Sequence, residues 1–378
     1  TNHPTGPIRP PDAHPPQNWW HKPPDRPHPA TRCTPAAELV AQTTRPGPSG
    51  HQIERALSRA HANGTAALGQ AGSMSQDLPS YDELPLIEGL DIRHAWEVFG
   101  PDDTLGSINL LTDERVARAA TLVRTGRRIS LDLPLNVPNP PLFGRQPFEH
   151  DVFALNRNEM DDRVDNFHLQ GSTQWDALNH VRCREHGYWG GRTQDPTEGP
   201  NGLGIHHWVE RGIAGRGVLI DVAVDDPLDG AVIDVDDIEA ALDRQDVTPE
   251  PGDIWCVRTG WPAAYQALDA EQRIAYAAEP RFAGLRGTEA MARFLWNHHP
   301  AALCCDNPAV EVVPGNPAEG SLHRRMLPAL GTAFGEMFDF ESLAQACRAD
   351  DRSTFFFTAA PLHIPNALGS PGNALAIL

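Results

Sequence analysis

Four short, mainly apolar runs constrain the fold of this chain more than any other feature. Each is five or six residues long, which suits a strand buried on both faces and is too short for a membrane-spanning helix. The runs occupy residues 218–223, 254–259, 301–305 and 354–358. Helical patterns lie between them, at 236–242, 288–298 and 340–347. This alternation of strands and helices predicts a mixed α/β fold.

Further elements are expected on both sides of these runs. Thr112 has the character of a helix N-cap, and Asp113 and Glu114 follow it in the first turn. Strands are expected at residues 128–133, 148–155 and 374–378.

The segment from His168 to His180 concentrates side chains capable of acid–base chemistry and metal binding. Asp176 and His180 are four residues apart, so a helix would place them on one face. A carboxylate and an imidazole that converge on one point form a minimal site for a divalent metal, or an acid/base pair. The alternative is an ordinary ion pair on a solvated helix, and for this pair alone it is the simpler interpretation.

The pattern around Asp176 resembles the signature of the cyclase family of metal-dependent hydrolases, which includes bacterial kynurenine formamidase and isatin hydrolase. The usual signature is His-x-Gly-Thr-His-x-Asp-x-Pro-x-His. Asp176 and His180 match it, whereas Gln170 and Gln174 replace the two leading histidines and Leu178 replaces the proline. A glutamine carbonyl is a weaker ligand than an imidazole. Either an oxygen-rich shell holds the metal here, or this branch has lost the metal and kept the fold.

Other short motifs of the same family follow in the expected order. Gly106–Thr112 is similar to the early Gly-x-x-Asn-Leu-Leu-Thr motif, and Arg258–Trp261 is similar to Arg-Thr-Gly-Trp. The resemblance also implies a later histidine and glutamate directed at the metal, which correspond to His323 and Glu336. For the fold, it implies a single domain over residues 74–378 with the swivelling β/β/α architecture, a mixed central sheet flanked by helices.

The resemblance assigns roles to particular residues. The implied metal ligands are Asp176, His180, His323, Glu336, Gln174 and Gln170. His180 and Glu336 are the expected catalytic residues. The expected substrate-binding residues are Trp175, Trp189, Arg258 and Trp261. For Arg258, an ion pair at the end of a strand is an equally good interpretation.

The implied reaction is hydrolysis of an amide, formamide or lactone in a small aromatic or cyclic molecule. A manganese or zinc ion would polarise the carbonyl and activate water. Two alternatives remain open at this stage: a ring-forming cyclase or dehydratase that uses the same acid/base pair, and a catalytically silent relative that binds a small molecule. Family analogy also suggests a homodimer or homotetramer.

The amino-acid composition limits the binding partners and the cellular compartment that can be expected. The 378-residue chain carries 31 basic and 50 acidic residues, a net charge of −19 that disfavours binding to nucleic acid. No apolar stretch is long enough to span a bilayer, so a membrane is not an expected partner. The six cysteines form no Cys-x-x-Cys pair, which suits reduced thiols in a cytoplasm.

Residues 1–73 differ in composition from the rest. They are rich in proline and carry little hydrophobic periodicity, a composition typical of disordered chain. Met74 then opens a segment with the character of a natural protein start. We therefore expect residues 1–73 to be a disordered or non-native extension.

Overall fold

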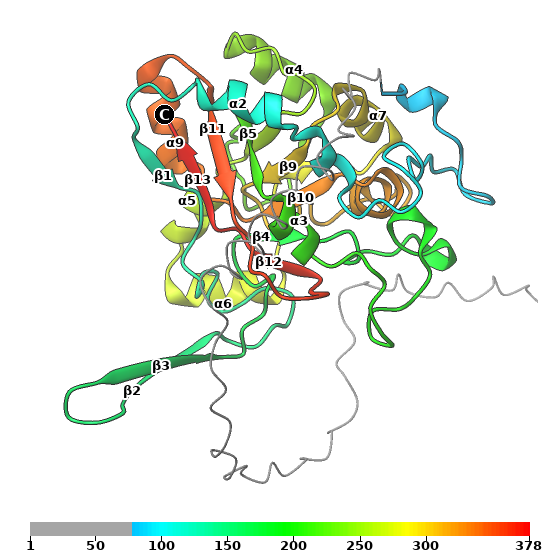
Figure 1. Ribbon diagram of the computed structural model, residues 1–378. Coiled ribbons are helices and arrows are strands. Elements are labelled where there is room, and N and C mark those ends of the chain that lie inside the picture. The colour runs from blue at the N-terminus through cyan, green and yellow to red at the C-terminus, as the bar shows by residue number, and fades with distance from the viewer. Residues whose placement is uncertain (1–77) are drawn as a thin grey trace, which may run out of the picture. The chain divides into compact units, whose positions relative to one another are not determined.

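A nine-stranded mixed sheet organises residues 78–378, the part of the chain that the computed structural model describes (Figure 1). The strand order is β1-β13-β11-β5-β7-β9-β10-β4-β12. The four strands β5, β7, β9 and β10 are parallel neighbours, and the remaining pairs are antiparallel. The predicted mixed α/β architecture, with a central sheet flanked by helices, is confirmed. The predicted extension at 1–73 lies outside the described residues.

The strands of this sheet are β1 (Arg128–Ser130), β4 (Gln174–Asp176), β5 (Ile213–Asp221), β7 (Ile254–Arg258), β9 (Ala302–Cys305), β10 (Ala333–Glu336), β11 (Thr354–Ala359), β12 (Gly369–Pro371) and β13 (Ala374–Ile377). Two smaller ladders pair β2 (Glu149–Ala154) with β3 (Met160–Asp165), and β6 (Val232–Ile233) with β8 (Gly284–Leu285).

The α-helices are α2 (Asp113–Ala120), α3 (His206–Arg211), α4 (Val235–Arg244), α5 (Trp261–Ala267), α6 (Ala270–Ala278), α7 (Glu289–His298), α8 (Leu322–Arg324) and α9 (Glu341–Asp350). Short helical turns are η1 (Tyr81–Glu83), η2 (Gly106–Leu110), η3 (Arg184–His186), η4 (Trp189–Gly191) and η5 (Arg325–Leu330), the last being a π-helix. None of the helices between residues 78 and 378 combines the length and apolar character needed to cross a membrane.

The local signals in the sequence account for most of these elements. Thr112 caps α2 by accepting a hydrogen bond from the backbone N–H of Arg115, as its position predicts. All four apolar runs form strands of the main sheet, namely β5, β7, β9 and β11. Helices α5 and α6 were not anticipated. Gly260, whose φ is +92°, starts α5, and Asp269 caps α6.

The core lies on both faces of the parallel strands. Every residue of β9 is buried, and β7 is buried from Ile254 to Val257. Helix α2 packs on β5 and β11, while α4 and α9 pack on β5. The five described cysteines, Cys183, Cys256, Cys304, Cys305 and Cys347, are buried and free.

The strand predicted at residues 148–155 forms, but outside the main sheet. It is β2, which pairs only with β3 in a hairpin that projects away from the body (Figure 1). All twelve residues of the two strands are exposed. Val152, Met160 and Val164 lie on one face of the hairpin, and the residues on the other face are charged except for Phe153, as the period of two in a strand places them.

Candidate metal centre

The sheet itself brings the first group of site residues together. Gln174 and Asp176 belong to β4 and are two residues apart, so their side chains point to the same face. The antiparallel register of β4 and β10 pairs Gln174 with Glu336, which places the Glu336 carboxylate on that face as well. The backbone at Asp176 is therefore a strand, and the helix considered for Asp176–His180 is wrong. A turn after β4 returns His180, whose Nε2 lies 4.0 Å from Asp176 Oδ2.

His323 completes a compact cluster from the other half of the chain. It belongs to α8, and its Nε2 lies 3.0 Å from Glu336 Oε1 and 3.8 Å from Asp176 Oδ2. One ligand atom from each of Asp176, His323 and Glu336 falls within 4.8 Å of the others, and all three residues are buried. The structure thus unites the four groups that the sequence analysis expected to converge, from segments about 150 residues apart.

A further carboxylate, Glu311, holds His323 in place and was not anticipated. Its Oε1 lies 2.8 Å from His323 Nδ1, while its Oε2 accepts a hydrogen bond from the backbone N–H of Leu322. The Ser321 hydroxyl also donates to Glu311. A carboxylate on one ring nitrogen of a histidine fixes the tautomer and leaves the other nitrogen available as a ligand. No local motif marks Glu311, which precedes His323 by 12 residues.

Both glutamines contact the cluster through their amide groups. Gln170 Nε2 donates to Asp176 Oδ1 at 2.6 Å, and Gln174 Nε2 donates to Glu336 Oε2 at 2.7 Å. In this cluster, two buried acceptors have no hydrogen-bond partner among the described residues, Asp176 Oδ2 and Gln174 Oε1. A buried acceptor left without a partner costs about 1–3 kcal/mol. A positively charged group at this point would relieve that cost.

The donor set fits a divalent cation. Metal–ligand bonds of about 2 Å imply ligand–ligand separations of about 3–4 Å. The separations of Asp176 Oδ2 from His323 Nε2 (3.8 Å) and from His180 Nε2 (4.0 Å) fall in this range, and both exceed a hydrogen bond. Two carboxylates and two imidazoles form the mixed O/N set that zinc and manganese accept. Asp176, His180, His323 and Glu336 could therefore hold such an ion.

The environment of the cluster shifts the pKa values of its titratable groups in different directions. Burial, followed by the charge of Asp176, raises the pKa of Glu336 to about 7. Burial also lowers the pKa of His180. For His323, burial acts to lower the pKa, but the hydrogen bonds to Glu311 and Glu336 outweigh it and the pKa is raised.

Arg145 is a second residue that the sequence analysis missed. Its guanidinium interacts electrostatically with Glu336 and Asp176, which favour its charged form, although burial is the larger effect and lowers its pKa. The guanidinium lies 5.4 Å from the centre of the Phe143 ring. Arg145 follows the loop at Pro138–Pro141, and nothing in that local sequence shows which way its side chain points.

The three tryptophans expected to bind substrate lie in the core. Trp175 is fully buried, and its indole N–H donates to the backbone oxygen of Gly372. Trp189 donates in the same way to Asp103, and Trp261 to the Tyr276 hydroxyl. Since each indole is buried and hydrogen-bonded, these rings contribute to packing.

Arg258, the fourth expected substrate-binding residue, is engaged in ion pairs. Its guanidinium makes a two-pronged contact with Glu341, with both distances close to 2.9 Å. Its Nη1 also donates to Asp221 at 2.8 Å. This is the ion-paired arrangement that the sequence analysis left open, and it ties the end of β7 to α9 and β5.

Comparison with known proteins identifies the family. The family model described as "Putative cyclase" matches residues 99–312. The chain belongs to this cyclase family. The resemblance drawn from the motifs around Asp176 is thereby confirmed.

One of the similar solved structures supports the family assignment. A structure described as a novel cyclase is 32% identical, with a TM-score of 0.67, and the alignment covers 75% of this chain and 99% of that one. Isatin hydrolase A from Labrenzia aggregata, bound to benzyl benzoate, is 18% identical with a TM-score of 0.49. Its alignment covers 68% of this chain and 94% of that one. A structure described as a potential metal-dependent hydrolase with cyclase activity is 17% identical with a TM-score of 0.42. Its alignment covers 66% of this chain and 98% of that one. A search of curated proteins finds no match.

Proposed function

We propose that this cyclase-family protein is a metal-dependent hydrolase that cleaves an amide, formamide or lactone bond in a small molecule. One observation carries the proposal. Asp176, His323 and Glu336 place their ligand atoms within 4.8 Å of one another in a buried site, where Asp176 Oδ2 has no hydrogen-bond partner among the described residues. A cluster of this kind is costly to bury unless it holds a cation.

The side chains of the site divide the work of hydrolysis. When bound, a zinc or manganese ion supplies a Lewis acid that polarises a carbonyl and activates a water molecule. With Asp176, His323 and Glu336 as the ligands, His180 is left to act as the general base, because burial lowers its pKa and keeps the imidazole neutral near neutral pH. Glu336, which lies 3.0 Å from His323 in the same cluster, can exchange a proton with the departing nitrogen or oxygen. Glu311 holds the His323 ring in a fixed orientation throughout.

A metal-free ring-forming cyclase or dehydratase is the second candidate, and the glutamines favour it. Gln170 and Gln174 donate hydrogen bonds to Asp176 and Glu336, so the carboxylates are partly satisfied by the protein itself. In that case His180 and Glu336 would act as a base and an acid without an ion.

Metal analysis combined with a substrate panel separates these candidates. The full chain is purified, its metal content is measured by mass spectrometry, and turnover is tested on small formamides and lactones before and after chelation. The proposal expects a stoichiometric ion that is lost in Asp176→Ala and kept in the control Asp113→Ala, whose side chain is 95% exposed. It also expects turnover that chelation abolishes.

Other outcomes would contradict the proposal in different ways. Turnover that survives chelation would support the metal-free cyclase. Absence of both an ion and turnover across the panel would support a catalytically silent relative that binds a small molecule.

A further inference from the structure

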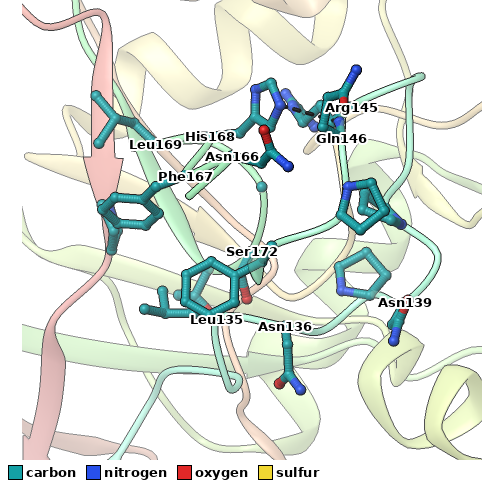
Figure 2. Close-up of a pocket in the computed structure, with 17 residues that line it drawn as sticks. Leu135, Asn136, Asn139, Arg145, Gln146, Asn166, Phe167, His168, Leu169 and Ser172 are labelled. Atoms are coloured by element: carbon teal, nitrogen blue, oxygen red, sulfur yellow. Dashed lines mark hydrogen bonds between the residues drawn. The ribbon is translucent and has the colours of Figure 1, made fainter. Parts of the chain in front are cut away.

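A small cavity lies beside the loop that carries Arg145, and both polar and apolar side chains line it (Figure 2). Its volume is about 60 Å³, enough for a group of the size of a carboxylate and a neighbouring water. Arg145, Gln146 and His168 gather on one side of it, and Asn136 lies on another (Figure 2). Phe148 and Phe167 add aromatic surface to the lining.

The charge of this cavity is opposite to that of the whole chain. The chain has 50 acidic and 31 basic residues. The described residues that line the cavity nevertheless include no carboxylate, and Arg145 is their one permanent cation. Within the described part of the chain, no carboxylate lies at ion-pair distance from Arg145. Asp176 and Glu336 act on Arg145 electrostatically but form no ion pair with it, so its guanidinium can still pair with an anion in the cavity.

Side-chain amides at other points of the lining supply further donors. The side chains of Asn136, Asn139 and Asn166 line the cavity and make no hydrogen bond to another described residue. Each carboxamide offers two N–H donors. These donors can complete the hydrogen-bonding of a carboxylate whose charge is balanced by Arg145.

The backbone holds this arrangement in place before any ligand arrives. Phe143 and Asn166, on the two segments that form the cavity, have φ values of +59° and +53°. Such conformations persist in non-glycine residues only where the surroundings impose them. The N–H of Gln146 donates to His168 Nε2 at 3.1 Å, and the N–H of Asn139 donates to the Tyr265 hydroxyl at 2.8 Å. These bonds fix the loop on either side of Arg145.

Arg145 also connects the cavity to the metal centre. Arg145 lines the cavity together with Ser172 and Thr173, which directly precede Gln174 and Asp176 on β4. Arg145 also interacts electrostatically with Asp176, Glu336 and His180. A group bound to Arg145 is therefore within the range at which a short molecule can reach the reacting side chains.

We propose that Arg145 and the amides of this cavity bind the carboxylate of the substrate, so that the substrates are small carboxylic acids whose scissile carbonyl reaches the metal centre. The part of this inference that concerns the scissile carbonyl rests on the proposed hydrolase function. Anion binding by the cavity does not, and it can be measured without turnover. Arg145 is thus a specificity-determining residue, since it selects the charge of the substrate.

The test compares benzoate with its neutral analogue benzamide, using calorimetric titration of the full chain. We expect benzoate to bind at least ten times more tightly than benzamide. Arg145→Gln should weaken benzoate binding by about 10- to 100-fold, the usual range for a hydrogen bond to a charged group, and leave benzamide unchanged. The matched control Arg124→Gln, which removes an exposed arginine elsewhere, should bind both ligands as the unaltered chain does.

Two further measurements keep the test decisive. Arg145→Lys retains the charge without the planar fork, so it should bind benzoate with intermediate affinity, and circular dichroism checks that each variant is folded. Benzoate binding should also survive chelation, which separates the cavity from the metal. Equal affinities for benzoate and benzamide, or no change in Arg145→Gln, would overturn the inference. If benzoate binds as expected in a chain without ion or turnover, the hydrolase proposal fails and the anion site stands.

Discussion

Glu311 and His323 are joined by a contact of 2.8 Å between Oε1 and Nδ1, and this contact leaves the opposite ring nitrogen 3.0 Å from Glu336 Oε1. The imidazole is thus held between two carboxylates with its orientation fixed. Only one of the two, Glu336, also faces Asp176. Glu311 acts on the metal centre through His323 without belonging to it.

Removal of the Glu311 carboxylate should therefore weaken metal binding without abolishing it. We expect Glu311→Gln to lower the affinity for zinc by about 10- to 100-fold, the usual effect of losing a partner that orients a ligand. Competition with a coloured chelator measures this affinity. The control Glu271→Gln, at an exposed position in α6, should not change it. Unaltered affinity in Glu311→Gln would show that the contact does not orient the ring.

A histidine at position 174 should strengthen metal binding, because it restores the imidazole of the family signature. Gln174 lies between Asp176 and Glu336, and its Oε1 has no partner among the described residues. We expect Gln174→His to raise the zinc affinity at least tenfold at pH 7.5, since imidazole is the stronger ligand. The gain should disappear below about pH 6, where a free imidazole is protonated.

The same chelator competition checks this expectation at both pH values. Gln266→His, an exposed substitution in α5, serves as the control for adventitious binding to an added histidine. A zinc affinity that stays constant or falls in Gln174→His would mean that position 174 does not face the ion.

The main strands of the sheet and four residues of the metal centre could be predicted from the sequence. The apolar runs predicted β5, β7, β9 and β11, because burial on both faces demands continuous hydrophobic sequence. The pairing of Asp176 and His180 with His323 and Glu336 came from the family signature. Spacing alone suggested a helix at Asp176, whereas the pairing of β4 with β10 imposes a strand.

Other features depend on tertiary contacts that no local pattern encodes. Glu311 reaches His323 only after the chain folds back, and Arg145 faces the carboxylates because its loop is fixed by Tyr265 and His168. The tryptophans expected to bind substrate were assigned wrongly for a related reason. The amino-acid sequence does not distinguish a tryptophan that lines a pocket from one that fills the core. Trp175 fills the core.

Replacement of Trp175 should accordingly cost stability and spare ligand binding. Its indole N–H donates to the Gly372 oxygen, and its ring packs edge-on against Phe338 and Phe357. We expect Trp175→Phe to lower the free energy of unfolding by about 1–3 kcal/mol, the cost of an unsatisfied buried acceptor. Urea denaturation measures the loss, and Phe153→Leu on the exposed strand β2 is the control. Weaker benzoate binding with unchanged stability would instead show that Trp175 contributes to ligand binding.

The pH dependence of stability should report on Asp132, a carboxylate beyond the metal centre. Burial is the main cause that raises its pKa from 3.8 to about 6, although the N–H of Ala374 donates to its Oδ2. The folded state therefore binds the Asp132 proton more tightly than the unfolded state does. It follows that the contribution of this group to stability is fully present below about pH 4 and is lost as the pH rises through 6.

Substitution with the neutral isostere isolates this contribution. The side chain in Asp132→Asn cannot ionise. The free energy of unfolding of this variant, measured relative to that of the unaltered chain, should therefore increase by up to about 3 kcal/mol between pH 4 and pH 7. Urea titrations at the two pH values measure the difference. Asp113→Asn, which alters an exposed carboxylate, should shift stability equally at both. If the gap between Asp132→Asn and the unaltered chain is the same at pH 4 and pH 7, then burial does not raise the pKa of Asp132 in the folded protein.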